Sequence, residues 1–176
     1  MEDPFTNSQI DVDVLPSLET LNLNELHKDY LTAKMISNLI FWLIILVSGG
    51  TAWFFLVDKL PGFLKIIAPI IIILIVISSF LLTYFGFKKK KYALREKDIL
   101  YQSGLLWRHK TVIPFNRIQH AEVTQGPIQR MFDLSVLRIF TAGGSSSDMS
   151  IPGIPPQKAH NIKEYVLGKT AADEEE

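Results

Sequence analysis

Two long apolar runs dominate the first half of the chain, and the second ends in a block of positive charge. That run, residues 64–87, has Lys65 as its only charged residue and stops at Lys88–Lys91. A helix needs about 20 apolar residues to cross the hydrocarbon core of a bilayer, and this run is long enough. Residues 36–57 form an earlier run of similar length with no charge. The pattern therefore predicts two transmembrane helices.

A short polar connection, Asp58–Gly62, separates the two runs. It makes the spans an antiparallel hairpin with both chain termini on one side of the membrane. Positive charge beside a span marks the cytoplasmic side, so Lys88–Lys91 predict that both termini are cytoplasmic. Small residues let two helices approach closely, and Ser48, Gly49 and Gly50 interrupt the first run. We expect this face to pack on the second span.

The residues before the spans fall into two parts. Residues 1–23 are polar, and all of their charged residues are acidic, which predicts a flexible tail. A segment that docks on a partner is the alternative. Beyond this tail, Leu26 and Tyr30 fit one face of a helix. Residues 24–87 are therefore predicted to hold a juxtamembrane helix and the two-span hairpin.

After the lysines, the apolar residues recur with a shorter period, in short stretches bounded by turn residues. In the clearest example Leu105, Trp107 and Ile113 share one face, and a period of two predicts a half-buried strand. The predicted strands are residues 92–95, 99–101, 105–113, 117–124, 136–142 and 149–151. Pro155–Pro156 then opens an amphipathic helix that we expect to end at Gly168.

These elements together predict a membrane protein with a two-helix transmembrane hairpin followed by a small, mainly-β cytoplasmic domain. The domain would occupy residues 88–168 as a sandwich or partly open barrel with a C-terminal capping helix. Residues 169–176 end in four acidic side chains and are predicted to form a disordered tail.

Charge and composition add to this picture. The chain of 176 residues has no formal net charge, but Lys and Arg outnumber Asp and Glu between Lys88 and Lys169. A basic domain suits a position beside an anionic leaflet. The chain contains no cysteine, which excludes a disulfide framework, a thiolate zinc site and a cysteine nucleophile.

Several motifs in this order are familiar as a set. They are Lys91–Leu94, Gly104–Trp107, Ile113–His120, Gln125–Phe132, Leu137–Gly144 and Ile151–Ile154. With them the chain resembles the bacterial pleckstrin-homology-like (PH-like) membrane proteins of the YdbS-like type, from about Lys91 to Leu167. The resemblance implies a split β-barrel closed at one end by the last helix and preceded by a two-span hairpin. Asp133 departs from it, because glycine is expected there; aspartate is among the few residues that tolerate positive φ.

The basic residues around the start of the domain are the candidate site. Cations near an anionic leaflet are each attracted by about 1 kcal/mol. A solvated surface is the alternative for the same residues. The candidates for membrane-surface contact are Lys88, Lys89, Lys90, Lys91, Arg95, Arg108 and Lys110.

No pattern in the sequence predicts catalysis, a metal or a cofactor. His109 and His120 lack a third ligand at a recognisable spacing. The Gly143–Asp148 segment lacks the residues that complete a phosphate-binding loop or a nucleophile elbow. Trp107 and Phe115 could stack on bases, but core packing explains both, and the membrane hairpin argues against a nucleic-acid partner.

We therefore predict a non-enzymatic, multi-pass protein of the bacterial cytoplasmic (inner) membrane that presents its PH-like domain as an interaction or scaffolding module. Its partner would be itself, a larger related membrane protein or anionic lipid. A small oligomeric channel or transport subunit is the alternative, which the glycines of the first span keep open. A membrane-tethered hydrolase that uses Ser145–Ser147 is a third.

Overall fold

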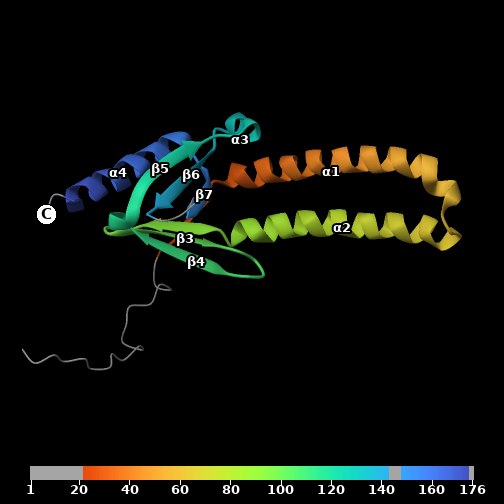
Figure 1. The fold of residues 1–176 in the computed structure, drawn as a ribbon, viewed down its shortest axis with the longest axis horizontal. Coiled ribbons are helices and arrows are strands. Elements are labelled where there is room, and N and C mark those ends of the chain that lie inside the picture. The colour runs from red at the N-terminus through yellow and green to blue at the C-terminus, as the bar shows by residue number, and fades with distance from the viewer. Residues whose placement is uncertain (1–21, 143–147, 175–176) are drawn as a thin grey trace, which may run out of the picture.

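The computed structural model describes residues 22–142 and 148–174, and it consists of a long helical hairpin and a compact mainly-β domain (Figure 1). Helices α1 (Lys28–Leu56) and α2 (Gly62–Lys88) run antiparallel and are joined through the short 3-10 helix η3 (Val57–Lys59). No residue in the apolar stretch of either helix is buried. Helices that are apolar on all sides and uncovered by protein suit a hydrocarbon environment.

The domain contains two antiparallel sheets. Strands β1 to β4 form one sheet in that order, and β5 to β7 form the other. The elements are β1 (Asn24–Glu25), β2 (Lys91–Leu94), β3 (Asp98–Ser103), β4 (His109–Pro114), η4 (Phe115–Arg117), β5 (Ile118–Thr124), α3 (Pro127–Met131), β6 (Ser135–Thr141), β7 (Met149–Ile154) and α4 (Pro156–Glu174). The six strands predicted after the spans are all present, and α4 packs on β5, β6 and η4.

The core between the sheets and α4 comes from alternating side chains. Leu137 and Ile139 of β6 are fully buried, as is Ile151 of β7. Phe115 is also buried, and its ring lies edge-on to that of Tyr165 with centroids 6.0 Å apart. The expectation that Phe115 packs in the core is confirmed.

The turn between β3 and β4 differs from the sequence-based expectation. The predicted strand from Leu105 begins only at His109, and Trp107 is 75% exposed instead of being in the core. Gly104 has φ 98°, and a Cβ placed on it would lie 1.7 Å from the Trp107 carbonyl oxygen. The chain therefore folds back on itself here, which brings the apolar residues to the tip of a hairpin.

The segment just before α1 belongs to the domain. Asn24 and Glu25 pair with β2. Leu26 and Tyr30 are buried, and each exposes only 4% of its surface. Gly153 of β7 has φ 70°, and a Cβ on it would lie 2.6 Å from the Tyr30 ring. The first turn of α1 is thus part of the domain's core, and not only a lead into the membrane.

Two further features of the domain bear on the sequence analysis. Asp133 has φ 48°, so this position does adopt the left-handed conformation expected there. The last helix continues through Gly168 to Glu174, so the expected end at Gly168 is wrong and residues 169–174 are helical. Thr170 Oγ1 donates to the Phe115 carbonyl oxygen over 3.1 Å, which ties this extension to η4.

Parts of the sequence analysis concern residues outside the described ranges. These are residues 1–21 of the predicted acidic tail, the Gly143–Ser147 segment with its three serines, and residues 175–176.

Candidate membrane-contact site

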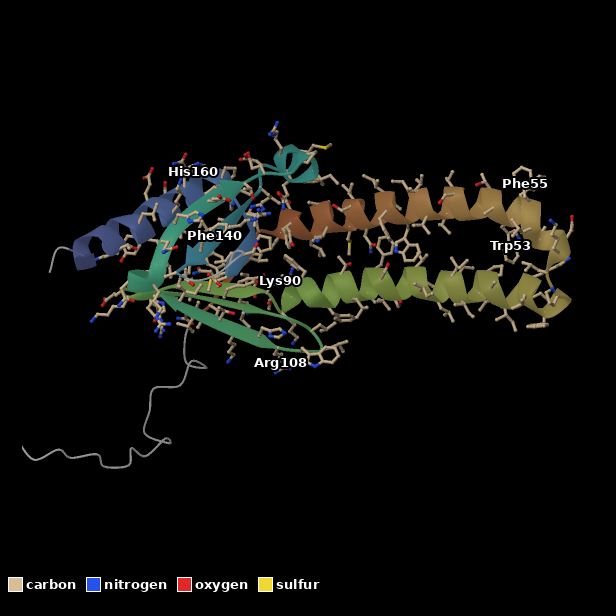
Figure 2. The ribbon with its side chains drawn as sticks, in the orientation of Figure 1. Trp53, Phe55, Lys90, Arg108, Phe140 and His160 are labelled. Atoms are coloured by element: carbon tan, nitrogen blue, oxygen red, sulfur yellow. The ribbon has the colours of Figure 1, made fainter. Side chains whose placement is uncertain are left out.

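The four lysines after the second span lie in different environments. Lys88 and Lys89 are exposed, and Lys88 Nζ lies 4.5 Å from the centre of the Tyr84 ring. Lys91 opens β2 and forms an ion pair with Glu25, with a nitrogen–oxygen distance of 3.0 Å. Lys90 is partly buried where α2 meets the domain (Figure 2). Burial lowers the pKa of Lys90, and the nearby charge of Lys34 lowers it further.

Arg95 is separated from these lysines. Strand β2 begins at Lys91 beside the end of α2, and Arg95 follows the last residue of that strand. Its guanidinium forms a hydrogen-bonded ion pair with Asp98, and this hydrogen bond is the main reason that the pKa of Arg95 is raised. Since Arg95 is paired at the other end of the strand, the structure does not bring it together with the other candidate cations.

The β3–β4 hairpin carries the remaining candidates toward the spans. Gln102 pairs with Lys91 on one side and with Lys110 on the other, so these three residues form one row across the sheet. Beyond that row the hairpin extends along the long axis of the molecule past the domain end of α2 (Figure 1). Arg108 lies near its tip (Figure 2). The tip therefore lies on the side of the domain from which the spans project.

The outermost residues of this hairpin are apolar. Leu106 and Trp107 are each 75% exposed, and they are followed by the exposed cations Arg108 and Lys110. This apolar tip was missed by the sequence analysis, which placed Trp107 in the core. The turn dipeptide Ser103–Gly104 directly precedes Leu105, Leu106 and Trp107. It could have indicated a hairpin tip at these residues in place of a strand.

Contacts between the spans do not involve Ser48–Gly50. A Cβ placed on Gly49 or Gly50 would meet no atom within 4 Å, and Ser48 Oγ donates to the Ile44 carbonyl of its own helix. The expected close approach of the second span is therefore absent at this point. We expected this face of α1 to pack on the second span, but no other part of the described chain covers it at Gly49 and Gly50.

Polar side chains join the spans nearer the domain. Trp42 Nε1 donates to Ser79 Oγ over 2.7 Å, and Asn38 Nδ2 lies 3.2 Å from the same oxygen. Asn38 Nδ2 also reaches Thr83 Oγ1 at 3.5 Å. Polar side chains find no water to bind in hydrocarbon, so hydrogen bonds between helices take its place. These residues fix the register of the two helices, and sequence reasoning had not singled them out.

The two histidines that we considered as metal ligands, His109 and His120, lie in different surroundings. His120 stacks on Phe140, with ring centroids 4.1 Å apart, and its Nε2 lies 3.8 Å from Glu122. His109 is an exposed residue at the start of β4. Among residues 22–142 and 148–174 there is no group of three His, Cys, Asp or Glu side chains that could hold a metal ion. The exposed features described above are the cations after α2 and on β4, and the apolar tip of the β3–β4 hairpin.

Comparison with known proteins agrees with this architecture. A family described as "Bacterial PH domain" matches residues 31–170. The UPF0699 transmembrane protein YdbS of Bacillus subtilis (strain 168) is 25% identical over 91 residues, which cover 52% of this chain and 55% of that protein. The UPF0699 transmembrane protein YdbT of the same organism is 32% identical over 81 residues, which cover 46% of this chain and 16% of that protein.

The match thus spans about half the length of YdbS and a small part of YdbT. No solved structure matches the chain. The relatives named as transmembrane proteins and the two uncovered apolar helices identify this chain as a membrane protein. Since the family match over residues 31–170 includes both predicted spans and strands β2 to β7, the chain belongs to the Bacterial PH domain family.

Proposed function

We propose that this protein holds its PH-like domain against the cytoplasmic leaflet of the bacterial inner membrane as a non-catalytic interaction module. Both termini are cytoplasmic in this proposal, because Lys88–Lys91 flank the second span. The module binds protein partners or anionic lipid. A second copy of the chain or a larger membrane protein with related domains fits the role of protein partner.

The apolar tip of the β3–β4 hairpin carries this proposal. Tryptophan favours the boundary between hydrocarbon and headgroups, and cations behind it are attracted by anionic lipid. Leu106 and Trp107 at the tip, with Arg108 and Lys110 behind them, have that order. The hairpin projects along the same axis as the spans (Figure 1). The spans and the hairpin tip thereby attach the domain to the membrane at two points.

Attachment at two points leaves the other surfaces of the domain free for partners. Strand β4 is an edge of its sheet, so its outer backbone groups have no strand partner within the described residues. An exposed edge can accept a strand from another protein. Confinement of both proteins to the membrane raises their effective concentration, so a weak contact of this kind is sufficient.

The first experiment measures the depth of Trp107 in a bilayer. The W42F/W53F variant retains Trp107 as its single tryptophan, since the chain has three. In vesicles whose acyl chains carry bromine near the headgroups, we expect strong quenching and a blue-shifted emission. The matched control removes Trp107 and places tryptophan at Tyr165 on α4, where we expect no quenching. Emission of Trp107 typical of water, without quenching, would contradict the proposal.

The second experiment identifies the partner. The protein is purified from native membranes in a mild detergent, and the intact mass of the complex and its lipids are measured. A stoichiometric second protein supports the scaffold role, and enrichment of anionic lipid that is lost when Lys88–Lys91 become glutamine supports lipid binding. Ion flux through liposomes that contain only this protein would instead favour the channel alternative.

A further inference from the structure

A crevice lies between α1 and α2 where the two helices meet the domain. Its volume is about 290 Å³, and it is open to the surroundings. It is lined by Tyr30, Lys34, Leu82, Thr83, Gly86, Phe87 and Lys90. The walls are mainly apolar, and the two lysines supply its only charges.

The two lysine amines of the crevice have no acidic partner in the described residues. The ion pairs of the described residues join carboxylates to His27, Lys91, Arg95 and His120, none of which lines the crevice. Lys90 Nζ has the Tyr30 hydroxyl at 3.5 Å and the Tyr30 ring centre at 5.4 Å. Tyr30 is thus the nearest polar neighbour of a partly buried cation.

This arrangement is unfavourable without an anion. Burial and the charge of Lys34 both lower the pKa of Lys90, which means that its charged form is destabilised in this position. An anion between the two amines would compensate both charges. The Tyr30 hydroxyl is close enough to Lys90 to donate a hydrogen bond to the same anion.

The crevice also lies at the level of lipid headgroups. Lys34 stands two positions before the first predicted span, and Lys90 stands two positions after the end of α2 at Lys88. Both amines are therefore at the boundary where the helices leave the hydrocarbon. Leu82 and Phe87 lie on the side of the crevice formed by α2 and offer apolar surface for glycerol and the first acyl carbons.

From this geometry we infer that the crevice binds the phosphate group of an anionic phospholipid between Lys34 and Lys90. Basic pockets between membrane helices are suited to anionic headgroups. The apolar walls favour a lipid over free phosphate, which shares the same charged group. This inference rests on the proposed position of the domain at the bilayer surface, but it does not depend on any protein partner.

The test measures binding of phosphatidylglycerol to the full chain in detergent by native mass spectrometry. The K34Q/K90Q variant should bind it about thirtyfold more weakly, since each cation near anionic lipid contributes about fivefold. The matched control K97Q/K169Q removes two exposed cations that belong neither to the crevice nor to the candidate membrane-contact residues, and its affinity should stay within about threefold of the native chain. The K34R/K90R variant, which keeps both charges, should retain most of the binding.

A second arm distinguishes the sources of the phosphate group. Inorganic phosphate at millimolar concentration should not displace the lipid. If it displaces the lipid in the native chain and binds without lipid, the site belongs to a soluble phosphate ligand. Equal loss in K34Q/K90Q and K97Q/K169Q, or no loss in either, overturns the site.

The proposed function has a separate readout in brominated vesicles, for which the same lysine substitutions are made in the W42F/W53F variant. Trp107 quenching reports whether the domain lies on the bilayer, and neither lysine pair contributes to the hairpin tip. Absent lipid binding together with intact quenching therefore overturns the crevice site alone. Folding of each variant is checked by its thermal melting curve, which must overlay that of the native chain.

Discussion

The two ends of the helical hairpin differ in what holds them. At the domain end, Tyr30 of α1 lies in the domain's core, and Trp42 and Asn38 form hydrogen bonds with Ser79 of α2. At the far end, a Cβ on Gly49 or Gly50 would meet nothing within 4 Å. One end is therefore fixed by specific protein contacts, whereas the other depends on the bilayer around it.

The outer and inner halves of α1 and α2 therefore have different roles. The outer halves need only apolar length, because the hydrophobic thickness of the bilayer sets their requirement. The inner halves need defined side chains, because they determine the orientation of the domain. Substitutions near the domain should be costly, and comparable substitutions near the loop should be tolerated.

The largest effect is expected from removal of the Tyr30 side chain. Tyr30→Ala deletes a buried aromatic ring and should lower the free energy of unfolding of the domain by about 3–5 kcal/mol. Pulse proteolysis in detergent, with urea as denaturant, measures this change. Thr32→Ala, an exposed position on the same helix, is the control and should change stability by less than about 0.5 kcal/mol. Equal stability of both variants would mean that α1 is not part of the core.

The next effect concerns the residue that faces this ring. Gly153→Ala adds a Cβ 2.6 Å from Tyr30 atoms at a φ of 70°, so both overpacking and backbone strain oppose it. We expect a loss of about 2–4 kcal/mol in the same assay. The control is Gly168→Ala, where a Cβ meets nothing and helix propensity favours alanine, so its stability should be equal or slightly higher.

A smaller effect tests the polar contacts between the spans. Ser79→Ala removes the acceptor for Trp42 and should weaken the helix pair by about 0.6–1.7 kcal/mol. Steric trapping in bicelles measures this interaction. Ser78→Ala is the matched control, because the Ser78 hydroxyl donates only to the Ile75 carbonyl of its own helix. An effect at Ser78 as large as that at Ser79 would contradict the interspan hydrogen bond.

The smallest effect is expected at the far end. Gly49→Ala should leave the stability of the helix pair within about 0.3 kcal/mol of the native value, because the added methyl group meets no protein atom. The same steric trapping assay measures it. A loss of more than about 1 kcal/mol would show that another helix covers this face, as in an assembly of several copies.

The regular part of the fold was predictable from the sequence. The spans follow from uncharged apolar length, and β2 to β7 follow from short apolar stretches between turns. The resemblance, which expects glycine at position 133, also indicated a positive φ there, and Asp133 adopts it. These features are encoded locally, so a local pattern is sufficient to find them.

The features that depend on distant contacts were not predictable in the same way. Strand β1 has two residues and exists only because it pairs with β2. The apolar residues after Gly104 fit a strand by composition, but a tight turn places Trp107 at the surface. In the candidate site, the sequence treated the cations as one group and could not separate Arg95, which forms an ion pair with Asp98, from Lys90, which is left beside Lys34.

Strand β1 also has a consequence for the order in which the protein is made. Glu25 and its partner Lys91 are 66 positions apart, and both spans lie between them. The ribosome releases β1 first, but its partner strand emerges only after both helices have been synthesised. If the helices fail to insert as a hairpin, Leu26 and Tyr30 cannot reach the domain, and its apolar interior stays open to proteases. The four-stranded sheet can therefore be completed only after both spans have been synthesised.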